Sequence, residues 1–384
     1  MEKVYVLAGC RTPIVTKNNR FKHIPAEKLG AVVVQRLLTD LGQDIYPDGL
    51  IAGNAVGTGG NIARLMALTA GLPDSVPAFT VDMQCASGAA AIAMGCAQIA
   101  SGNGDMYICG GMESSSLQPV RIYNEHDERY GRTAHGDGRY MTAQFSPGEL
   151  AEDAMLRGAD AVMVAEGVTR EELDFWVLRS HRLAAQCADQ GLLQSRIVPL
   201  EGVTRDDGIR YRMSQRLLDR LPSLLGGDSL LNAGNACLIN DGAAFVVLVS
   251  EAWLAANPGF TAQAEILGTC TAGGSPVESP RGAMATADKL LARHGLTYED
   301  MDAIEFNEAF AVIDVLFQRE HPHLIDRYNM LGGALAYGHP YGASGGIIMI
   351  HLLRALELVK GSLGLMSVAG AGGMGQSILV RKTG

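Results

Sequence analysis

Charged residues are scarce in this chain of 384 residues, where they make up 19% of the total against a usual share of about 25%. Basic residues are the scarcer kind, because 31 Lys and Arg stand against 41 Asp and Glu and leave a net charge of −10. Basic runs are also missing, which argues against binding to the phosphates of nucleic acids. Hydrophobic residues reach 47%, enough for a large buried core, and they exclude a chain that is disordered throughout.

The sequence also lacks the patterns of membrane, secreted and metal-binding proteins. No run of about 18 apolar residues is present to cross a membrane, and the first residues do not resemble a secretory signal. The seven cysteines include no Cys-x-x-Cys pair, and no His-Glu-x-x-His spacing is found. We therefore expect no disulfide framework and no metal site, and we expect a reduced, cytoplasmic protein.

Glycine is abundant, at 47 of 384 residues, which predicts many tight turns and close backbone contacts. Strand-like apolar runs alternate with helical spacing in the first third of the chain. This alternation predicts a layered α/β domain with parallel pairing. The expected strands are 4–8, 49–56, 79–83 and 105–109, and the expected helices are 26–41, 61–70 and 86–100.

An internal repeat indicates two similar halves. Ser87-Gly88 and Ser344-Gly345 each precede an apolar helix, a strand and a Gly-Gly-Met turn, although chance similarity of Gly-rich helices is the alternative. A more highly charged stretch within the N-terminal half is interpreted as an insertion, with helices expected near 148–166 and 170–190. The predicted division is 1–250 for the N-terminal half, including an inserted loop domain at about 117–235, and 260–384 for the C-terminal half.

Cys85 and His339 are the candidates for covalent chemistry. Cys85 follows an expected strand and opens an expected helix, whose dipole should lower the thiol pKa and favour a nucleophilic thiolate. His339 lies between Gly338 and Pro340 and could accept the thiol proton. The alternatives are a small buried cysteine, as expected for Cys96, and an ordinary loop histidine.

Two glycine motifs near the C-terminus are weak matches to known signatures. Residues 370–375 fit Gly-x-Gly-x-x-Gly, but a strand is expected at 377–381 where a dinucleotide site needs a helix. Residues 342–346 fit Gly-x-Ser-x-Gly, but no strand is expected immediately before the serine. We expect Ser344 instead to cap the helix that starts near Gly346.

Four segments together carry a resemblance that none of them carries alone. They are the segment around Cys85, Asn307-Glu-Ala-Phe-Ala311, residues 332–345 and Gly372-Gly-Met-Gly375, in that order. Over nearly the whole chain the sequence resembles the thiolase family of acyl-CoA acyltransferases. The resemblance implies two pseudo-symmetric βαβαβαββ halves in a five-layered α-β-α-β-α arrangement, with an inserted loop domain.

The resemblance also implies an enzyme mechanism. Cys85 attacks an acyl thioester after His339 takes its proton, and the acyl-enzyme then forms or cleaves a 3-oxoacyl-CoA. Asn307 orients a water that makes one oxyanion hole with His339, and the backbone N–H groups of Cys85 and Ala371 make the other. Acyl-CoA and coenzyme A are substrates, no cofactor is permanently bound, and a homodimer or homotetramer is expected. No residues of the CoA site are assigned.

One departure from the family pattern keeps other functions open. Thiolases usually carry a second cysteine, which moves the α-proton of acetyl-CoA, at the position that matches Ala369 here. An alanine cannot transfer a proton. The alternatives to C–C chemistry are therefore Cys-dependent acyl transfer to a non-carbon nucleophile or water, as in a thioesterase, and a non-catalytic acyl-CoA-binding subunit of a complex.

Overall fold

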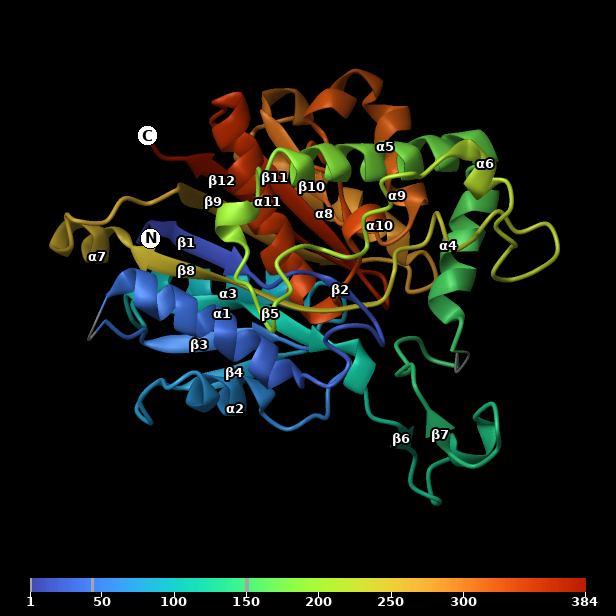
Figure 1. Ribbon diagram of the computed structural model, residues 1–384, viewed down its shortest axis with the longest axis horizontal. Coiled ribbons are helices and arrows are strands. Elements are labelled where there is room, and N and C mark those ends of the chain that lie inside the picture. The colour runs from blue at the N-terminus through green and yellow to red at the C-terminus, as the bar shows by residue number, and fades with distance from the viewer. Residues whose placement is uncertain (1, 43–44, 149–151) are drawn as a thin grey trace.

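The computed structural model describes residues 2–42, 45–148 and 152–384, and its core is one mixed β-sheet with helices packed on it (Figure 1). The strands run in the order β10-β11-β12-β9-β1-β8-β5-β3-β4, and β2 pairs with β8. The short β6 and β7 form a separate hairpin. The strand bounds are β1 Val4–Arg11, β2 Val15–Thr16, β3 Gly49–Gly53, β4 Ala78–Val81, β5 Met106–Ser114, β6 Arg121–Ile122, β7 Arg139–Tyr140, β8 Asn240–Ser250, β9 Ala264–Gly273, β10 Ala303–Phe306, β11 Leu363–Gly370 and β12 Met374–Lys382.

The helices cover the sheet and fill the space between its two parts. Most begin and end within a few residues of the expected positions, because apolar periodicity follows the buried face of each helix. The α-helix bounds are α1 Ala26–Leu41, α2 Ile62–Thr69, α3 Ser87–Ala100, α4 Ala154–Ala165, α5 Arg170–Asp189, α6 Gln215–Leu218, α7 Glu251–Ala256, α8 Gly282–His294, α9 Ala311–Glu320, α10 Ala334–Tyr337 and α11 Ser344–Val359.

The two halves repeat one pairing pattern, as the resemblance predicts. In the N-terminal half β3 and β5 are parallel, whereas β5 and β1 are both antiparallel to β8. In the C-terminal half β10 and β11 are parallel, whereas β11 and β9 are both antiparallel to β12. The expected parallel pairing thus holds for only part of each half. Strands β8 and β12 are antiparallel to both of their neighbours. Each lies between the parallel strands of its half and the first strand of that half, which is β1 for β8 and β9 for β12.

Helices α3 and α11 lie at the centre, between the strands of the two halves (Figure 1). Their N-termini meet without side chains between them: a Cβ on Gly345 would lie 2.0 Å from the backbone nitrogen of Ala89. A Cβ on Gly88 would lie 2.6 Å from the carbonyl oxygen of Gly342. The repeated Ser-Gly pair therefore marks the contact between the halves. The expectation that no apolar run is long enough to cross a membrane is wrong, because Tyr341–Val359 has the length and composition for it. The structure buries 78% of its 18-residue apolar window in this core.

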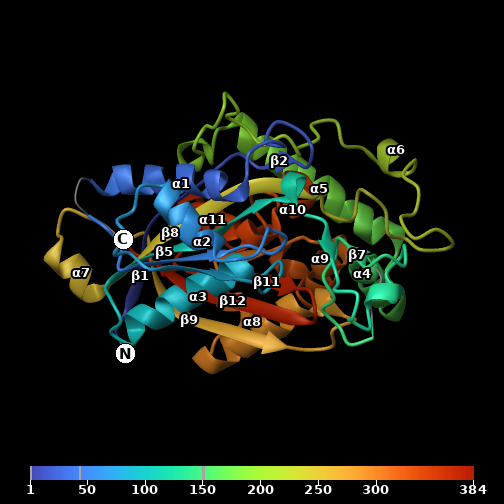
Figure 2. The ribbon, with the colours of Figure 1, turned by 90° about the horizontal axis from the view of Figure 1, so that it is seen from below.

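The insertion packs beside the core and carries α4, α5 and α6 together with the projecting β6–β7 hairpin (Figures 1 and 2). The helix expected near 148–166 begins at Ala154, and residues 149–151 of that prediction lie outside the described residues. A buried ion pair ties the insertion to β1, because both terminal nitrogens of Arg11 bind the Asp206 carboxylate at 2.7 and 2.8 Å.

Candidate active site

Cys85 lies in a tight turn between β4 and α3. Gln84 has a left-handed backbone with φ 53°, and its N–H donates to Asp82 Oδ1 at 2.9 Å. The hydroxyl of Ser87 closes the turn, since it accepts from the N–H of Met83 at 2.8 Å and donates to the carbonyl of Gln84 at 2.5 Å. The turn holds Cys85 in front of the first residue of α3.

Burial, rather than the helix dipole, determines the pKa of the Cys85 thiol. Its residue is 9% exposed, and burial raises the thiol pKa to about 12. Hydrogen bonds from the backbone N–H groups of Cys85 and Ala371 lower the pKa, but by less. The expectation of a lowered thiol pKa is therefore wrong, because loss of solvent around a charged sulfur outweighs the nearby dipoles. The resting group is a thiol that needs a base.

The His339 imidazole is a neutral base at this site. It is buried, and burial lowers its pKa to about 3. Its Nδ1 lies 2.6 Å from Ser344 Oγ, and the Ser344 hydroxyl donates to the Pro340 carbonyl at 3.2 Å. Ser344 Oγ therefore accepts a hydrogen bond from Nδ1–H of His339, and Nε2 keeps its lone pair. The prediction that Ser344 caps a helix is wrong: α11 begins at Ser344, with Ala343 as its N-cap.

Asn307 lies directly beside this base. It follows β10, and its side-chain Nδ2 lies 3.4 Å from Nε2 of His339. Its backbone N–H donates to the Ser367 carbonyl at 3.0 Å. The adjacent Glu308 is buried and accepts hydrogen bonds from Ser180 Oγ at 2.6 Å and Asn329 Nδ2 at 2.9 Å. The loop that carries Asn307 is thus held from both sides.

A buried carboxylate and an amide hold the loop that carries His339. Glu113, at the end of β5, accepts from the Gly342 N–H at 3.0 Å and the Ala55 N–H at 2.9 Å. Asn240 Oδ1, at the start of β8, accepts from the His339 N–H at 3.0 Å. Burial raises the Glu113 pKa to about 7, although its backbone donors oppose this effect. Sequence reasoning assigned a role to neither residue.

The C-terminal glycine turn completes the surroundings of Cys85. Ala369 and Gly370 end β11, and the N–H of Ala371 bonds to the Cys85 sulfur. A Cβ on Gly370 would lie 3.0 Å from the Met83 carbonyl. The strand β12 follows this turn, as expected. Cys85 from one half and the glycine turn from the other therefore meet at the sulfur. His339, with Asn307 beside it, belongs to the same half as the turn.

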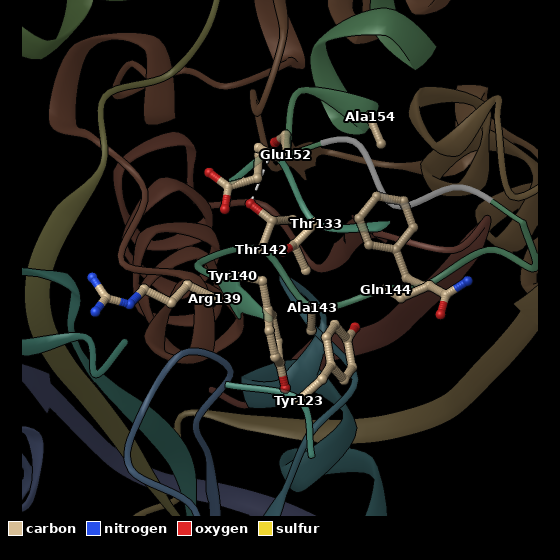
Figure 3. Close-up of a pocket in the computed structure, with 11 residues that line it drawn as sticks. Tyr123, Thr133, Arg139, Tyr140, Thr142, Ala143, Gln144, Glu152 and Ala154 are labelled. Carbon is tan, nitrogen blue, oxygen red and sulfur yellow. Dashed lines mark hydrogen bonds between the residues drawn. The ribbon is translucent and has the colours of Figure 1, made fainter. Parts of the chain in front are cut away.

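A surface pocket of the insertion borders this turn (Figure 3). Tyr123 and Tyr140 stack in its wall with ring centroids 4.2 Å apart, and Thr142 donates to the Glu152 carbonyl at 3.3 Å. Phe145 also lines the pocket, and its carbonyl oxygen lies 3.1 Å from the position of a Cβ on Gly372. Within the described ranges, no group of three or more His, Cys, Asp and Glu side chains is placed to hold a metal ion.

Known proteins share this arrangement over its whole length. The family model of the thiolase N-terminal domain matches residues 4–252, and that of the thiolase C-terminal domain matches residues 260–382. A putative acetyl-CoA C-acetyltransferase of Staphylococcus aureus is 33% identical over 99% of both chains. A probable acetyl-CoA acyltransferase of the same species is 32% identical over 100% of both.

Solved structures agree with these sequence relatives. The Bacillus anthracis acetyl-CoA acetyltransferase superposes with a TM-score of 0.91 at 29% identity, covering 100% of this chain and 99% of that one. Human mitochondrial 3-ketoacyl-CoA thiolase, solved in complex with CoA, gives a TM-score of 0.90 at 28% identity, covering 100% and 98%. From its sequence, its fold and the segments that form this site, the chain belongs to the thiolase family.

Proposed function

We propose that the chain is a thiolase-type acyltransferase that forms or cleaves 3-oxoacyl-CoA through an acyl-enzyme on Cys85. The observation that carries the proposal is a buried thiol hydrogen-bonded by Ala371, together with a neutral imidazole beside the Asn307 amide, in segments that the close contact of α3 and α11 brings together. The printed activities of the relatives, acetyl-CoA acetyl- and acyltransferase, support acyl-CoA as the substrate class. Coenzyme A is then the second substrate rather than a bound cofactor.

The geometry supports a role for each group. His339 Nε2 takes the Cys85 proton, and the thiolate attacks the carbonyl carbon of the substrate. The N–H groups of Cys85 and Ala371 converge on the sulfur, so they lie where they can donate to an oxyanion formed on a carbon bound to it. Asn307, beside Nε2, orients a water for the thioester oxygen of the other substrate. An assembly of two or four copies in the cytoplasm is part of the same proposal.

Ala369 favours one second candidate. Aligned on Gly372-Gly-Met-Gly375, it takes the position of the second cysteine of thiolases, and its methyl group moves no proton. A chain that kept acylation but lost proton transfer would pass the acyl group to water or to an oxygen or nitrogen nucleophile. The intact Cys85, His339 and Asn307 arrangement argues against a third possibility, a non-catalytic subunit.

The proposal is tested by CoA-dependent cleavage of acetoacetyl-CoA and longer 3-oxoacyl-CoAs, followed by loss of their absorbance. We expect cleavage by the protein and none by Cys85→Ala, while Cys96→Ala, a change in the same helix region away from the site, keeps the activity. The chain-length profile defines the substrate. Absence of cleavage at every length, with acyl-Cys85 still formed, would reject C–C chemistry in favour of transfer to another nucleophile.

A further inference from the structure

Cys237 is a second cysteine at the site, and the roles described above do not use it. Its backbone N–H donates to the carbonyl of Ala309 at 3.0 Å. The carbonyl of the next residue, Leu238, accepts from the N–H of His339 at 3.0 Å. Cys237 is therefore held between the loop that carries Asn307 and the loop that carries His339.

The thiols of Cys237 and Cys85 are close enough to interact. Burial raises the pKa of Cys237, and a negative charge on Cys85 raises it further. Tyr341 is near both: burial has the largest effect in raising its pKa, and negative charges on Cys237 and Cys85 raise it further. The Tyr341 ring centroid lies 5.0 Å from that of His339. Four side chains from three segments of the chain thus surround the same space.

Cys237 lies at the edge of the core rather than inside it. It is only partly buried, and it packs at the margin of the apolar cluster that contains Ala369. The Cys237 sulfur accepts a hydrogen bond from the backbone N–H of the same residue, within residues 2–42, 45–148 and 152–384 that the structure describes. A thiol beside the nucleophile, with no side-chain hydrogen bond within those residues, is suited to chemistry rather than to holding the fold.

We propose that Cys237 is the proton-transferring group of this chain and takes over the function that Ala369 cannot perform. The proposal rests on the C–C chemistry proposed above. In cleavage, the Cys85 thiolate attacks C3 of the 3-oxoacyl-CoA, the C2–C3 bond breaks, and its electron pair stays on C2. Cys237 gives its proton to C2, and acetyl-CoA leaves. The Cys237 thiolate then takes the proton of the CoA thiol, whose sulfur attacks the acyl group and expels the Cys85 thiolate.

The coupling between the two thiols matches this order of events. While Cys85 carries a negative charge, repulsion keeps the proton on Cys237, which must then act as an acid. Once Cys85 is acylated its charge is gone, and a thiolate on Cys237 becomes easier to form. Cys237 is therefore an acid before acylation and a base after it, which is the alternation that the two steps need.

The test separates acyl transfer from proton transfer. Exchange of label between acetyl-CoA and free CoA needs acylation of Cys85 but no proton at C2. In this exchange the proton that His339 took from Cys85 goes to the departing CoA thiolate and returns from the incoming CoA thiol, so that Cys237 is not needed. Incorporation of deuterium from D2O into the acetyl group, and cleavage of acetoacetyl-CoA, need both. We expect Cys237→Ser to keep the exchange within about threefold and to lose deuterium incorporation and cleavage by about 10²- to 10⁴-fold, the usual contribution of a general acid–base group. Cys96→Ser is the matched control and keeps all three reactions.

A second variant tests whether the lost function is proton transfer itself. Adding Ala369→Cys to Cys237→Ser restores a thiol at the usual family position, and we expect it to recover at least tenfold in cleavage. Unchanged deuterium incorporation and cleavage in Cys237→Ser would overturn the proposal. So would a parallel loss of the exchange, because it would show that Cys237 only supports the site. Failure of the C–C function would be seen differently, as exchange without cleavage in the unaltered protein.

Discussion

Cys85 and His339 are both held in their neutral forms by burial. The thiol pKa is raised to about 12 and the imidazole pKa is lowered to about 3. The pair therefore rests as thiol and imidazole, unlike cysteine–histidine pairs that rest as thiolate and imidazolium. In the empty site the proton therefore stays on Cys85. It moves to His339 only when an acyl thioester is bound.

The pH dependence of Cys85 alkylation tests this resting state. Only the thiolate reacts with iodoacetamide, so the alkylation rate should rise about tenfold per pH unit from pH 7 to pH 9 without a plateau, because the thiol pKa lies far above this range. The rate is measured by mass spectrometry of the peptide that contains Cys85, with Cys85→Ala as the blank. A plateau with a midpoint below pH 7 would instead indicate a thiolate–imidazolium pair.

Single residues also show where sequence reasoning reaches its limit. Cys85, His339 and Asn307 could be named from the sequence because each stands in a motif of fixed chemistry. From the sequence, Ser344 is interpreted as a helix cap, although its partner His339 lies only five residues away. Cys237 could not be named, because its neighbours come from distant parts of the chain and no local pattern encodes how those loops pack.

At the level of elements, the end of β5 positions the loop that carries His339. Both oxygens of Glu113 accept from N–H donors, Oε1 from Asn54 Nδ2 at 2.8 Å and Oε2 from Gly342 at 3.0 Å. Burial nevertheless raises the pKa of this carboxyl to about 7. The folded protein therefore holds the Glu113 proton more tightly than the unfolded chain does.

The sign of this shift sets how stability depends on pH. A raised carboxyl pKa gives stability that is fully present below the unfolded value, near 4.5, and is lost as the pH rises through about 7. We expect the difference in unfolding free energy between the protein and Glu113→Gln to narrow by about 1.4 kcal/mol per pH unit within that window. Urea denaturation from pH 5 to pH 8 measures it. The exposed control Glu125→Gln should show no such trend, and a pH-independent difference for Glu113→Gln would contradict the expectation.

Element boundaries were largely predictable, but strand pairing was not. The helix Ala26–Leu41 has the predicted bounds, since its apolar face repeats regularly. The strand β1, in contrast, pairs with β8, for example Val4 with Ser250, and nothing near either strand indicates this partner. The pairing of strands so far apart in the sequence depends on how the whole sheet is buried. Local residue propensities carry no information about that burial.

At the level of the whole molecule, the buried pair of Arg11 and Asp206 connects the insertion to the core. The two side chains are 0% and 5% exposed, and Asp206 Oδ1 also accepts from the N–H of Ile14 at 2.7 Å. The guanidinium lies 5.9 Å from the ring centroid of Tyr337, which precedes the His339 loop. The contact therefore holds the insertion, β1 and the region of the site together.

Removing the carboxylate should destabilise the protein strongly. Asp206→Ala leaves the Arg11 charge buried without a partner, and we expect a loss of about 3–5 kcal/mol in unfolding free energy. The matched control is Asp40→Ala, which breaks a pair with Arg36 whose side chains are 46% and 44% exposed and should cost about 0–1 kcal/mol. Urea denaturation of both variants measures the two losses in unfolding free energy. Equal losses would show that the buried pair contributes no more than a surface pair.

The side-chain-free contact between α3 and α11 also limits how this protein can recombine with its relatives. A chimera that joins the N-terminal half of one thiolase to the C-terminal half of another keeps this contact only if the first parent carries glycine at position 88 and the second carries glycine at position 345. A methyl group at either position would push the N-termini of α3 and α11 apart. These two glycines therefore restrict which halves of different thiolases can be combined, whatever catalytic side chains the halves carry.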